Sequence, residues 1–310
     1  MRSSAAALHE IPVREDMVFI PGGTFRMGSD RHYPEEAPVH RVSVDPFWID
    51  RTPVTNRQFR EFVRATGHVT TAEVPPDPEQ YPGAAPDMLH AGSLVFTQPA
   101  HRVDLDDWTQ WWAFARGASW RHPGGRKSTI RGLDFHPVVH VSFSDALAFA
   151  RWAGKDLPTE AEWELAAGGG RTQLYPWGNL EPDAQRMMCN YGGARPGEDG
   201  YEYTAPVSMF DAGRSPFGVY NMAGNVWEWC KDNYSATAYT AGDFAKGQAR
   251  QSELDRARVN PLGPQFGDKR VIRGGAYTST IYDCRVTARE AYEPNFHPMN
   301  VGFRGVLRVQ

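Results

Sequence analysis

The sequence contains few cysteines. Its 310 residues include only Cys189, Cys230 and Cys284. They are too few and too widely spaced for a disulfide framework or for a paired CxxC zinc site. We therefore expect three buried thiols in a reducing compartment.

The sequence also lacks an excess of positive charge and a long apolar run. The formal net charge is -4 with both signs interspersed, so there is no basic stripe to neutralise nucleic-acid phosphates. No stretch approaches the roughly 20 apolar residues of a membrane span. His9 and Glu10 come before any apolar run of signal-peptide length. We expect a cytoplasmic monomer that binds neither nucleic acid nor membranes.

Turn-forming and aromatic residues are abundant instead. The chain has 30 Gly, 24 Pro and 10 Trp, a composition typical of many turns and aromatic anchors around little regular structure. No linker-like segment or internal repeat divides it. The sequence predicts one loop-rich α+β domain over residues 17–310, preceded by an N-terminal extension over residues 1–16.

Three helices are predicted from capping signals and apolar spacing. The first begins after Thr55 and ends at Gly67. The second is capped near Ser144, ends at Gly154 and carries the apolar stripe Leu147, Phe149, Ala150 and Trp152. The third begins at the T-x-x-E capping box of Thr159 and Glu162 and ends at glycines 168–170. Trp163 on this third helix is expected to be buried.

Short strands are predicted before the first of these helices and after the third. Alternating side chains indicate a hairpin over residues 17–28. Within residues 39–50 they indicate a strand that stops at Pro46 and runs into a turn. Strand-like pieces follow at 205–210, 269–275 and 300–307. Residues 70–135 are rich in proline and tryptophan and are interpreted as a long, anchored insertion. Its WTQWW segment, residues 108–112, forms either the aromatic plug of this insertion, which we favour, or a substrate platform.

Two histidines, His136 and His140, are spaced so that they share one face of a helix or strand, as in some metal sites. No third ligand stands nearby. We interpret both as hydrogen-bonded core histidines.

Several motifs occur together in a distinctive order. They are IPGGTFRMG, DRTPVTNRQFREFV, HPVVHVSFSDALAFARWAGKDLPTEAEWELAAGGG, YPWGN, YNMAGNVWEWC, and RVIRGG followed by VGFR. In this order they resemble the formylglycine-generating enzyme, or sulfatase-modifying factor, family. The resemblance extends from about residue 17 to about residue 307. It implies a C-type-lectin-like fold with little regular structure, in agreement with the composition.

The resemblance also implies a chemistry. Members of this family use oxygen to oxidise a cysteine in an unfolded sulfatase segment to Cα-formylglycine. Two active-site thiols hold a copper(I) ion in that reaction, because soft thiolates select Cu(I). The family further implies two structural calcium ions, since a hard cation takes about six to eight oxygen ligands, which loop carbonyls can supply.

The positions that match the family's two calcium sites are intact. One site would be formed by the side chains of Asn190 and Asp199 with the carbonyls of Tyr191 and Tyr201. The other would be formed by the side chains of Asn221 and Glu228 with the carbonyls of Gly224 and Val226. The alternative is that Asn221 and Asn225 merely satisfy turns and Glu228 lies on the surface.

The segment RGGAYTSTIYDCRVTAR departs from the family pattern. Ala276 replaces a serine, Ser279 replaces the first cysteine, and Asp283 replaces the tyrosine before Cys284. If RVTAR is aligned instead of the glycines, the loop is shorter than in the family and Cys284 becomes either the second cysteine or a core thiol. A serine hydroxyl is a hard ligand and cannot supply the soft thiolate that Cu(I) requires.

Two hypotheses follow. The chain is either a copper-dependent oxidase of an extended sulfatase peptide, with a cleft lined by Trp227, Ser279, Asp283 and Cys284 and copper held by Cys284, or a relative that does not form formylglycine. Such a relative is a calcium-stabilised module that binds a peptide or small ligand in the same cleft, or an enzyme of different oxidative activity.

Overall fold

The computed structural model describes residues 14–309, apart from residues 81–82, 84–88, 100, 102, 105, 184–185, 193–198 and 241–257. Residues 1–13 of the predicted N-terminal extension lie outside this range. Within the described part of the chain, no helix is long and apolar enough to cross a membrane.

Three α-helices and many short strands make up the regular structure. The helices are α1 (Asn56–Thr66), α2 (Phe143–Trp152) and α3 (Glu160–Gly168). The strands are β1 (Met17–Ile20), β2 (Gly23–Met27), β3 (His40–Val44), β4 (Phe47–Asp50), β5 (Gly92–Phe96), β6 (Trp112–Arg116), β7 (Trp227–Asn233), β8 (Arg258–Val259), β9 (Arg270–Arg273), β10 (Arg289–Tyr292), β11 (Val301–Gly302) and β12 (Val306–Arg308). Short 3₁₀ helices are η1 (Pro34–Glu36), η2 (Thr71–Glu73), η3 (Pro78–Gln80), η4 (Trp108–Gln110), η5 (Asp211–Gly213) and η6 (Ile281–Cys284).

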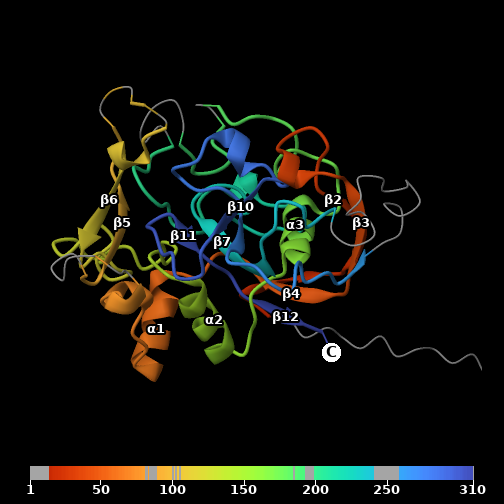
Figure 1. Cartoon of the computed structure of the whole chain (residues 1–310). Helices are drawn as coiled ribbons and strands as arrows, with labels where there is room; N and C mark the ends of the chain where they lie inside the picture. Colours follow the sequence, from red (N-terminus) through yellow and green to blue (C-terminus); the bar gives the residue numbers. More distant parts are fainter. Residues whose placement is uncertain are drawn as a thin grey trace, which may run out of the picture.

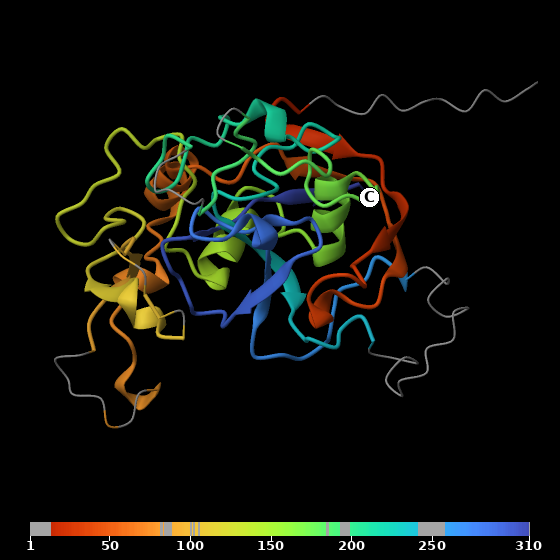
Figure 2. The same cartoon turned by 90° about the horizontal axis from the view of Figure 1, so that it is seen from above.

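The strands form four small sheets. Their orders are β10-β9-β7-β11, β1-β4-β12, β2-β3-β8 and β5-β6. Figure 1 shows α3 beside the sheet that contains β7 and β10, with α1 and α2 together at one end of the molecule. The β5-β6 hairpin, yellow in both pictures, lies at one edge in the view of Figure 1 and in the view from above in Figure 2. The predicted loop-rich α+β architecture is confirmed.

The hairpin predicted for residues 17–28 is wrong. Both strands exist, but β1 pairs with β4 and β2 pairs with β3, each antiparallel. The turn between β1 and β2 carries the chain from one sheet into another, and each strand finds its partner farther along the sequence. The alternation of side chains identified the strands and could not identify their partners.

The helix boundaries follow the capping signals. Thr55 caps α1 by accepting a hydrogen bond from the backbone N–H of Gln58, and Gly67 ends the helix in the left-handed conformation. Thr159 and Glu162 form the predicted capping box of α3. For α2 the cap is Ser142, two residues before the predicted Ser144. Trp152, assigned to its buried stripe, is 45% exposed, so that assignment is wrong.

Other predictions for the second half of the chain had mixed outcomes. Residues 270–273 form β9 as expected, but residues 205–210 form turns and no strand. The piece at 300–307 is two strands, β11 and β12, which belong to different sheets. Backbone groups in 205–210 make irregular contacts, such as the bond from the Val207 N–H to the Phe135 carbonyl.

The core consists of two large clusters that meet around β7 and β9. One cluster contains Trp163 of α3, which is fully buried as predicted, and the other contains Trp229 of β7. Buried ion pairs cross between α3 and the sheet, because Arg273 of β9 pairs with Glu160 and Glu164. These contacts hold the start of the loop that follows β9.

Candidate functional site

The loop that carries Ser279, Asp283 and Cys284, three of the four predicted catalytic residues, runs from the end of β9 to Cys284. Its first two residues, Gly274 and Gly275, are glycines with positive φ. A Cβ at position 275 would lie 2.6 Å from the Sγ of Cys284, closer than real atoms approach. Glycine is therefore required there, because it lets the thiol pack directly against the backbone. Cys284 itself is fully buried.

Ser279 has a structural role in this loop. Its hydroxyl accepts a hydrogen bond from the Ala276 N–H (3.0 Å), and its own N–H donates to the Ala276 carbonyl (2.9 Å). The Ser279 carbonyl accepts from the Gly192 N–H (2.7 Å), which ties the loop to the segment after Cys189. The side chain thus closes a turn.

Asp283 is engaged with the N-terminal segment. Its Oδ1 accepts a hydrogen bond from the Tyr33 hydroxyl (3.0 Å), and its Oδ2 accepts from the Thr280 hydroxyl (2.8 Å). This bond and burial raise the pKa of Tyr33 to about 12, burial being the larger cause. The Asp283 carboxylate therefore serves to fix the loop against the segment that contains Tyr33.

Trp227 lies in the core. It is the first residue of β7, is 6% exposed, and belongs to the same apolar cluster as Ala276. Its N–H donates to the Asn300 carbonyl (2.9 Å). Trp227 therefore belongs to the core cluster on which Ala276, near the start of the loop, also packs. Cys284 belongs to a different cluster.

The cluster around Cys284 contains a second thiol. Cys284, Cys189 and Ala223 form a small buried group, with Trp177, Tyr191 and Ile281 packed against it. Burial, and after it the interaction with the neighbouring Cys284 thiol, raises the pKa of Cys189 well above its usual value. Sequence reasoning treated Cys189 only as a buried thiol. Its position directly before Asn190, a predicted calcium ligand, was the available signal.

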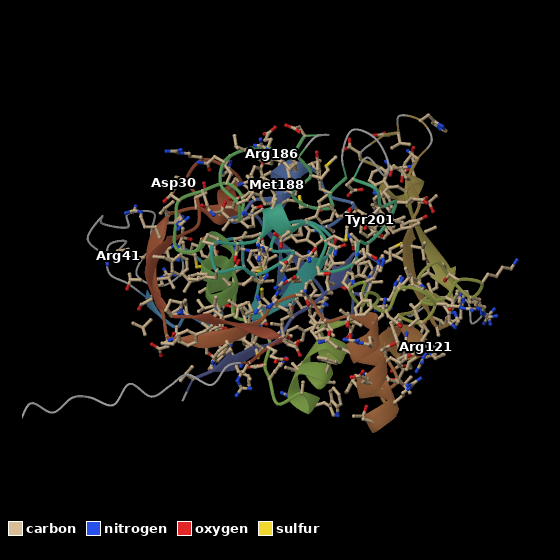
Figure 3. The ribbon with its side chains drawn as sticks, turned by 180° about the vertical axis from the view of Figure 1, so that it is seen from behind. Asp30, Arg41, Arg121, Arg186, Met188 and Tyr201 are labelled. Carbon is tan, nitrogen blue, oxygen red and sulfur yellow. The ribbon has the colours of Figure 1, made fainter. Side chains whose placement is uncertain are left out.

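In the first predicted calcium set, Asn190 and Asp199 each make hydrogen bonds within the surrounding loops. Asn190 is buried, its side-chain N–H donates to the Tyr203 carbonyl (2.7 Å), and its backbone carbonyl accepts from the Asn225 N–H (2.7 Å). Oδ1 of Asp199 accepts from the Tyr201 N–H (3.0 Å). Figure 3 labels Tyr201, together with Arg186 and Met188 of the segment that leads to Cys189. These oxygen-bearing groups are compatible with a hard cation.

In the second predicted set, Glu228 has a cationic protein partner. Its two carboxylate oxygens accept hydrogen bonds from Arg304 (2.7 and 2.6 Å) and from the Trp163 indole (2.8 Å). Three of about four lone-pair positions are thus used. A calcium ion here would have to share Glu228 with a guanidinium.

The remaining members of the second set lie in a tight turn. Asn221 and Gly224 both have positive φ, and Oδ1 of Asn221 accepts from the Asn225 side chain (3.1 Å). Arg304 also donates to the Asn221 carbonyl (3.4 Å), so this turn and Glu228 are joined through one guanidinium. The carbonyl of Gly224 accepts from the Val226 N–H (3.0 Å). Calcium at either position stays a prediction.

Both histidines of the HPVVH segment are hydrogen-bonded; His140 is a core histidine as predicted, whereas His136 is only half-buried, so the core assignment is wrong for His136. His140 contacts the Ser93 hydroxyl and the Pro123 carbonyl, each at 2.8 Å, and burial lowers its pKa to about 4. His136 contacts the Thr204 hydroxyl (3.0 Å). Among the residues that the structure describes, no group of three or more His, Cys, Asp and Glu side chains could hold a metal ion.

A cavity of 420 Å³ lies beside the loop and not within it. It is lined by parts of β2, α3, residues 170–174 and the segment after Cys284, including Arg26, Glu164, Arg171 and Val286. No predicted site residue lines this cavity, although the structure describes all of them. Two of its lining residues, Leu174 and Val286, are joined by a hydrogen bond from the Val286 N–H to the Leu174 carbonyl (2.7 Å).

The β5-β6 hairpin lies on the other side of the loop. Phe96 of β5 contacts the ring of Tyr277 (centroids 6.1 Å apart), and the Met299 N–H donates to the Leu94 carbonyl (3.2 Å). Trp108, just before β6, is 53% exposed, and Phe114 of β6 is 50% exposed. The prediction that residues 108–112 form an internal plug is therefore wrong for Trp108.

Comparison with known proteins places this site in a family. The profile of the Sulfatase-modifying factor enzyme 1-like domain matches residues 5–309. The chain belongs to the sulfatase-modifying factor (formylglycine-generating enzyme) family. It is 53% identical over 219 residues to the formylglycine-generating enzyme of Mycobacterium tuberculosis, covering 69% of this chain and 73% of that one. It is 43% identical over 305 residues to the enzyme of the same name from Thermomonospora curvata, covering 94% and 93%.

Not every member of the family carries the name of an active enzyme. The inactive Cα-formylglycine-generating enzyme 2 of Bos taurus is 36% identical over 307 residues, covering 93% of this chain and 87% of that one. The solved structure of PvdO from Pseudomonas aeruginosa covers 94% of each chain with a TM-score of 0.62 at 24% identity, and it supports the fold alone.

Proposed function

We propose that this family member oxidises a cysteine in an extended segment of a sulfatase to Cα-formylglycine, using oxygen and copper(I). The observation that carries the proposal is that the loop from Ala276 to Cys284 joins two features such a reaction needs. One is a buried thiol, Cys284, and the other is an exposed aromatic hairpin on which an extended peptide can lie.

The hairpin is suited to an extended chain. β5 and β6 form a two-stranded sheet whose outer edges pair with no strand that the structure describes. Such edges accept an added strand through backbone hydrogen bonds, and neighbouring aromatic rings then contact its side chains. Exposed Trp108 and Phe114 supply such rings, and the contact of Phe96 with Tyr277 connects the hairpin to the loop.

The residues of the loop have separable roles in this proposal. Cys284 would hold copper(I), which when bound supplies the activation of oxygen. Ser279 and Asp283 would shape the loop, because both side chains are engaged in turn and tether hydrogen bonds. Trp227 would support the start of the loop from the core.

A second candidate function is a non-oxidising, calcium-stabilised paralogue that binds a peptide or small ligand on the same surface. The hydrogen bond from the Ala276 N–H to the Ser279 hydroxyl favours this second candidate, because position 279 then offers no soft metal ligand. Both candidates use the hairpin, so peptide binding alone does not separate them.

The deciding experiment is aldehyde formation. The purified chain, loaded with Cu(I) under oxygen and a thiol reductant, is incubated with a peptide containing C-x-P-x-R and with the same peptide carrying serine for cysteine. We expect an aldehyde, captured as an oxime and identified by mass spectrometry, only from the cysteine peptide. Binding of both peptides without any aldehyde would establish the second candidate. Ser279→Cys, which adds a soft ligand, tests whether that position limits turnover.

A further inference from the structure

The three cysteines do not occupy equivalent positions. Cys230 is buried on β7 in one large core cluster, whereas Cys189 and Cys284 meet in a separate small cluster with their thiols in contact. We propose that Cys189 and Cys284 form a two-sulfur site for a soft monovalent metal ion, with Cys189 as the ligand that position 279 no longer supplies. The proposal deepens the proposed function, but metal binding by the pair does not depend on the reaction.

Each thiol is positioned by a glycine that allows close approach. Gly275 leaves room for the Sγ of Cys284, as described above. On the opposite side, a Cβ at Gly224 would lie 2.2 Å from the Asn190 carbonyl oxygen and 3.3 Å from the Cβ of Cys189. The N–H of Gly224 donates to the Gly274 carbonyl (2.8 Å), which joins the two glycine-containing turns. The backbone therefore determines the contact between the thiols.

The surroundings select the class of metal. Ala223, Trp177, Tyr191 and Ile281 enclose the pair. As noted for the described part of the chain, no third His, Cys, Asp or Glu completes a metal-binding group. A structural zinc ion needs four ligands, whereas Cu(I) is selected by soft sulfur donors. Two thiols in an apolar enclosure therefore favour Cu(I) over Zn²⁺ or a hard cation.

Metal binding must release protons. Both thiols lose their S–H proton as two sulfur–metal bonds form, so one Cu(I) ion replaces two protons and no oxidation occurs. The apparent affinity for Cu(I) should accordingly rise with pH through the neutral range.

The test is a competition titration of the full-length chain with Cu(I) and a chromophoric Cu(I) chelator, under argon and with excess reductant. We expect tight binding of one ion per chain. Cys189→Ala and Cys284→Ala should each weaken it by more than the roughly 10–100-fold that follows loss of an outer-sphere partner. Cys230→Ala, which removes the third buried thiol and lies in a different cluster, should bind as the unmodified chain does.

Further measurements keep the proposal falsifiable. Circular dichroism and a melting curve identify a variant that fails to fold, and Cys189→Ser, which keeps the shape of the side chain, then replaces Cys189→Ala. Unchanged affinity in a folded Cys189 variant would overturn the assignment. A second result would also overturn it: the protein, isolated without reductant, contains a disulfide between Cys189 and Cys284, and after reduction of that disulfide it takes up no Cu(I).

The aldehyde assay separates this inference from the proposed function. Tight Cu(I) binding that depends on both cysteines, without aldehyde formation, would refute the oxidase and leave the metal site established. Aldehyde formation that persists unchanged in Cys189→Ser would refute the role of Cys189 and leave the oxidase established.

Discussion

Arg304 and Glu228 form a buried ion pair in which the guanidinium Nε and Nη2 bond the two carboxylate oxygens at 2.7 and 2.6 Å. The Trp163 indole donates a third bond to the same carboxylate. The ion pair joins β7 to the segment before β12, and the hydrogen bond from Trp163 connects α3 to the same carboxylate. Because neither charge reaches solvent, each partner depends on the other for its stability in the interior.

Removing Arg304 should therefore be costly. We expect Arg304→Met to lower the free energy of unfolding by about 3–5 kcal/mol, since Glu228 would remain as an uncompensated buried charge. Urea denaturation measures this. Arg214→Met is the matched control, because Arg214 pairs with Asp211 at the surface and should change stability by about 1 kcal/mol or less. Equal effects of the two substitutions would contradict the buried-pair argument.

Calcium binding is tested by chelation. A bound ion stabilises the native state by about 2.7 kcal/mol at a hundred times its Kd, so a chelator should lower the melting temperature. Asp199→Asn and Glu228→Ala should each reduce the difference between melting curves with and without chelator. The difference is the quantity to compare, because Glu228→Ala also leaves Arg304 unpaired. A melting curve that is indifferent to chelator would refute both calcium sites.

Trp163 contributes both volume and a hydrogen bond. It is fully buried, and a Cβ at Gly274 would lie 3.1 Å from its ring. Trp163→Ala should cost about 3–5 kcal/mol through lost transfer energy and a cavity. Trp163→Phe should cost about 1–3 kcal/mol, because it keeps most of the volume but removes one donor from Glu228. Urea denaturation of both variants measures the cost of the cavity and the cost of the lost hydrogen bond. Near-native stability of Trp163→Ala would show that the burial of Trp163 contributes little to folding.

A buried histidine predicts a pH dependence. Burial lowers the pKa of His140 to about 4 from 6.5, so the unfolded chain binds more protons than the native chain between these values. The stabilisation is fully present above pH 6.5 and is lost as the pH falls toward 4. From pH 7 to pH 5 the loss attributable to His140 should be about 2 kcal/mol.

His140→Asn tests this, because asparagine tolerates the positive φ of position 140. Urea denaturation at pH 7 and pH 5 should show a smaller loss in the variant than in the unmodified chain. The exposed His101 supplies the control substitution, His101→Asn. His40, whose pKa burial also lowers to about 4, contributes equally in all three proteins. An unchanged pH dependence in His140→Asn would contradict the argument.

Local signals were sufficient where an element depends on its own residues. The caps at Thr55 and Thr159 were predictable, because capping signals are encoded within one helix. The burial of Trp163 was predicted as well, but α3 is buried on all sides, so no apolar face distinguishes this residue. Strand pairing was not predictable in the same way. β1 and β2 adjoin in sequence yet belong to different sheets, and only contacts with β4 and β3 decide this.

The candidate site shows the same division. The motifs located the loop and the residues Ser279, Asp283 and Cys284. They did not reveal that Asp283 bonds Tyr33, or that Cys189 reaches Cys284, because both contacts join segments far apart in sequence. Arg304 as the partner of Glu228 was missed for the same reason. Such partners are set by the packing of loops, for which a single sequence carries no periodic signal.

The position of the Cys284 thiol can be changed without removing any sulfur. A Cβ at position 275 would collide with the Cys284 Sγ at 2.6 Å and approach the Asp283 carbonyl oxygen at 3.1 Å. Gly275 also has a φ of 73°, which disfavours alanine. Gly275→Ala should therefore lower stability by about 1–3 kcal/mol and weaken Cu(I) binding, although Cys189 and Cys284 are both retained.

Gly132→Ala separates the two causes. Gly132 has a similar φ of 83°, but a Cβ there would meet nothing within 4 Å. It should show the cost of backbone strain alone and leave Cu(I) affinity unchanged. Urea denaturation and the chelator competition are measured on both variants. If Gly275→Ala binds Cu(I) as tightly as Gly132→Ala does, the close contact between Gly275 and Cys284 does not position the thiol for metal binding. A selective loss of affinity in Gly275→Ala would show that the backbone of the loop sets the distance between the two sulfurs.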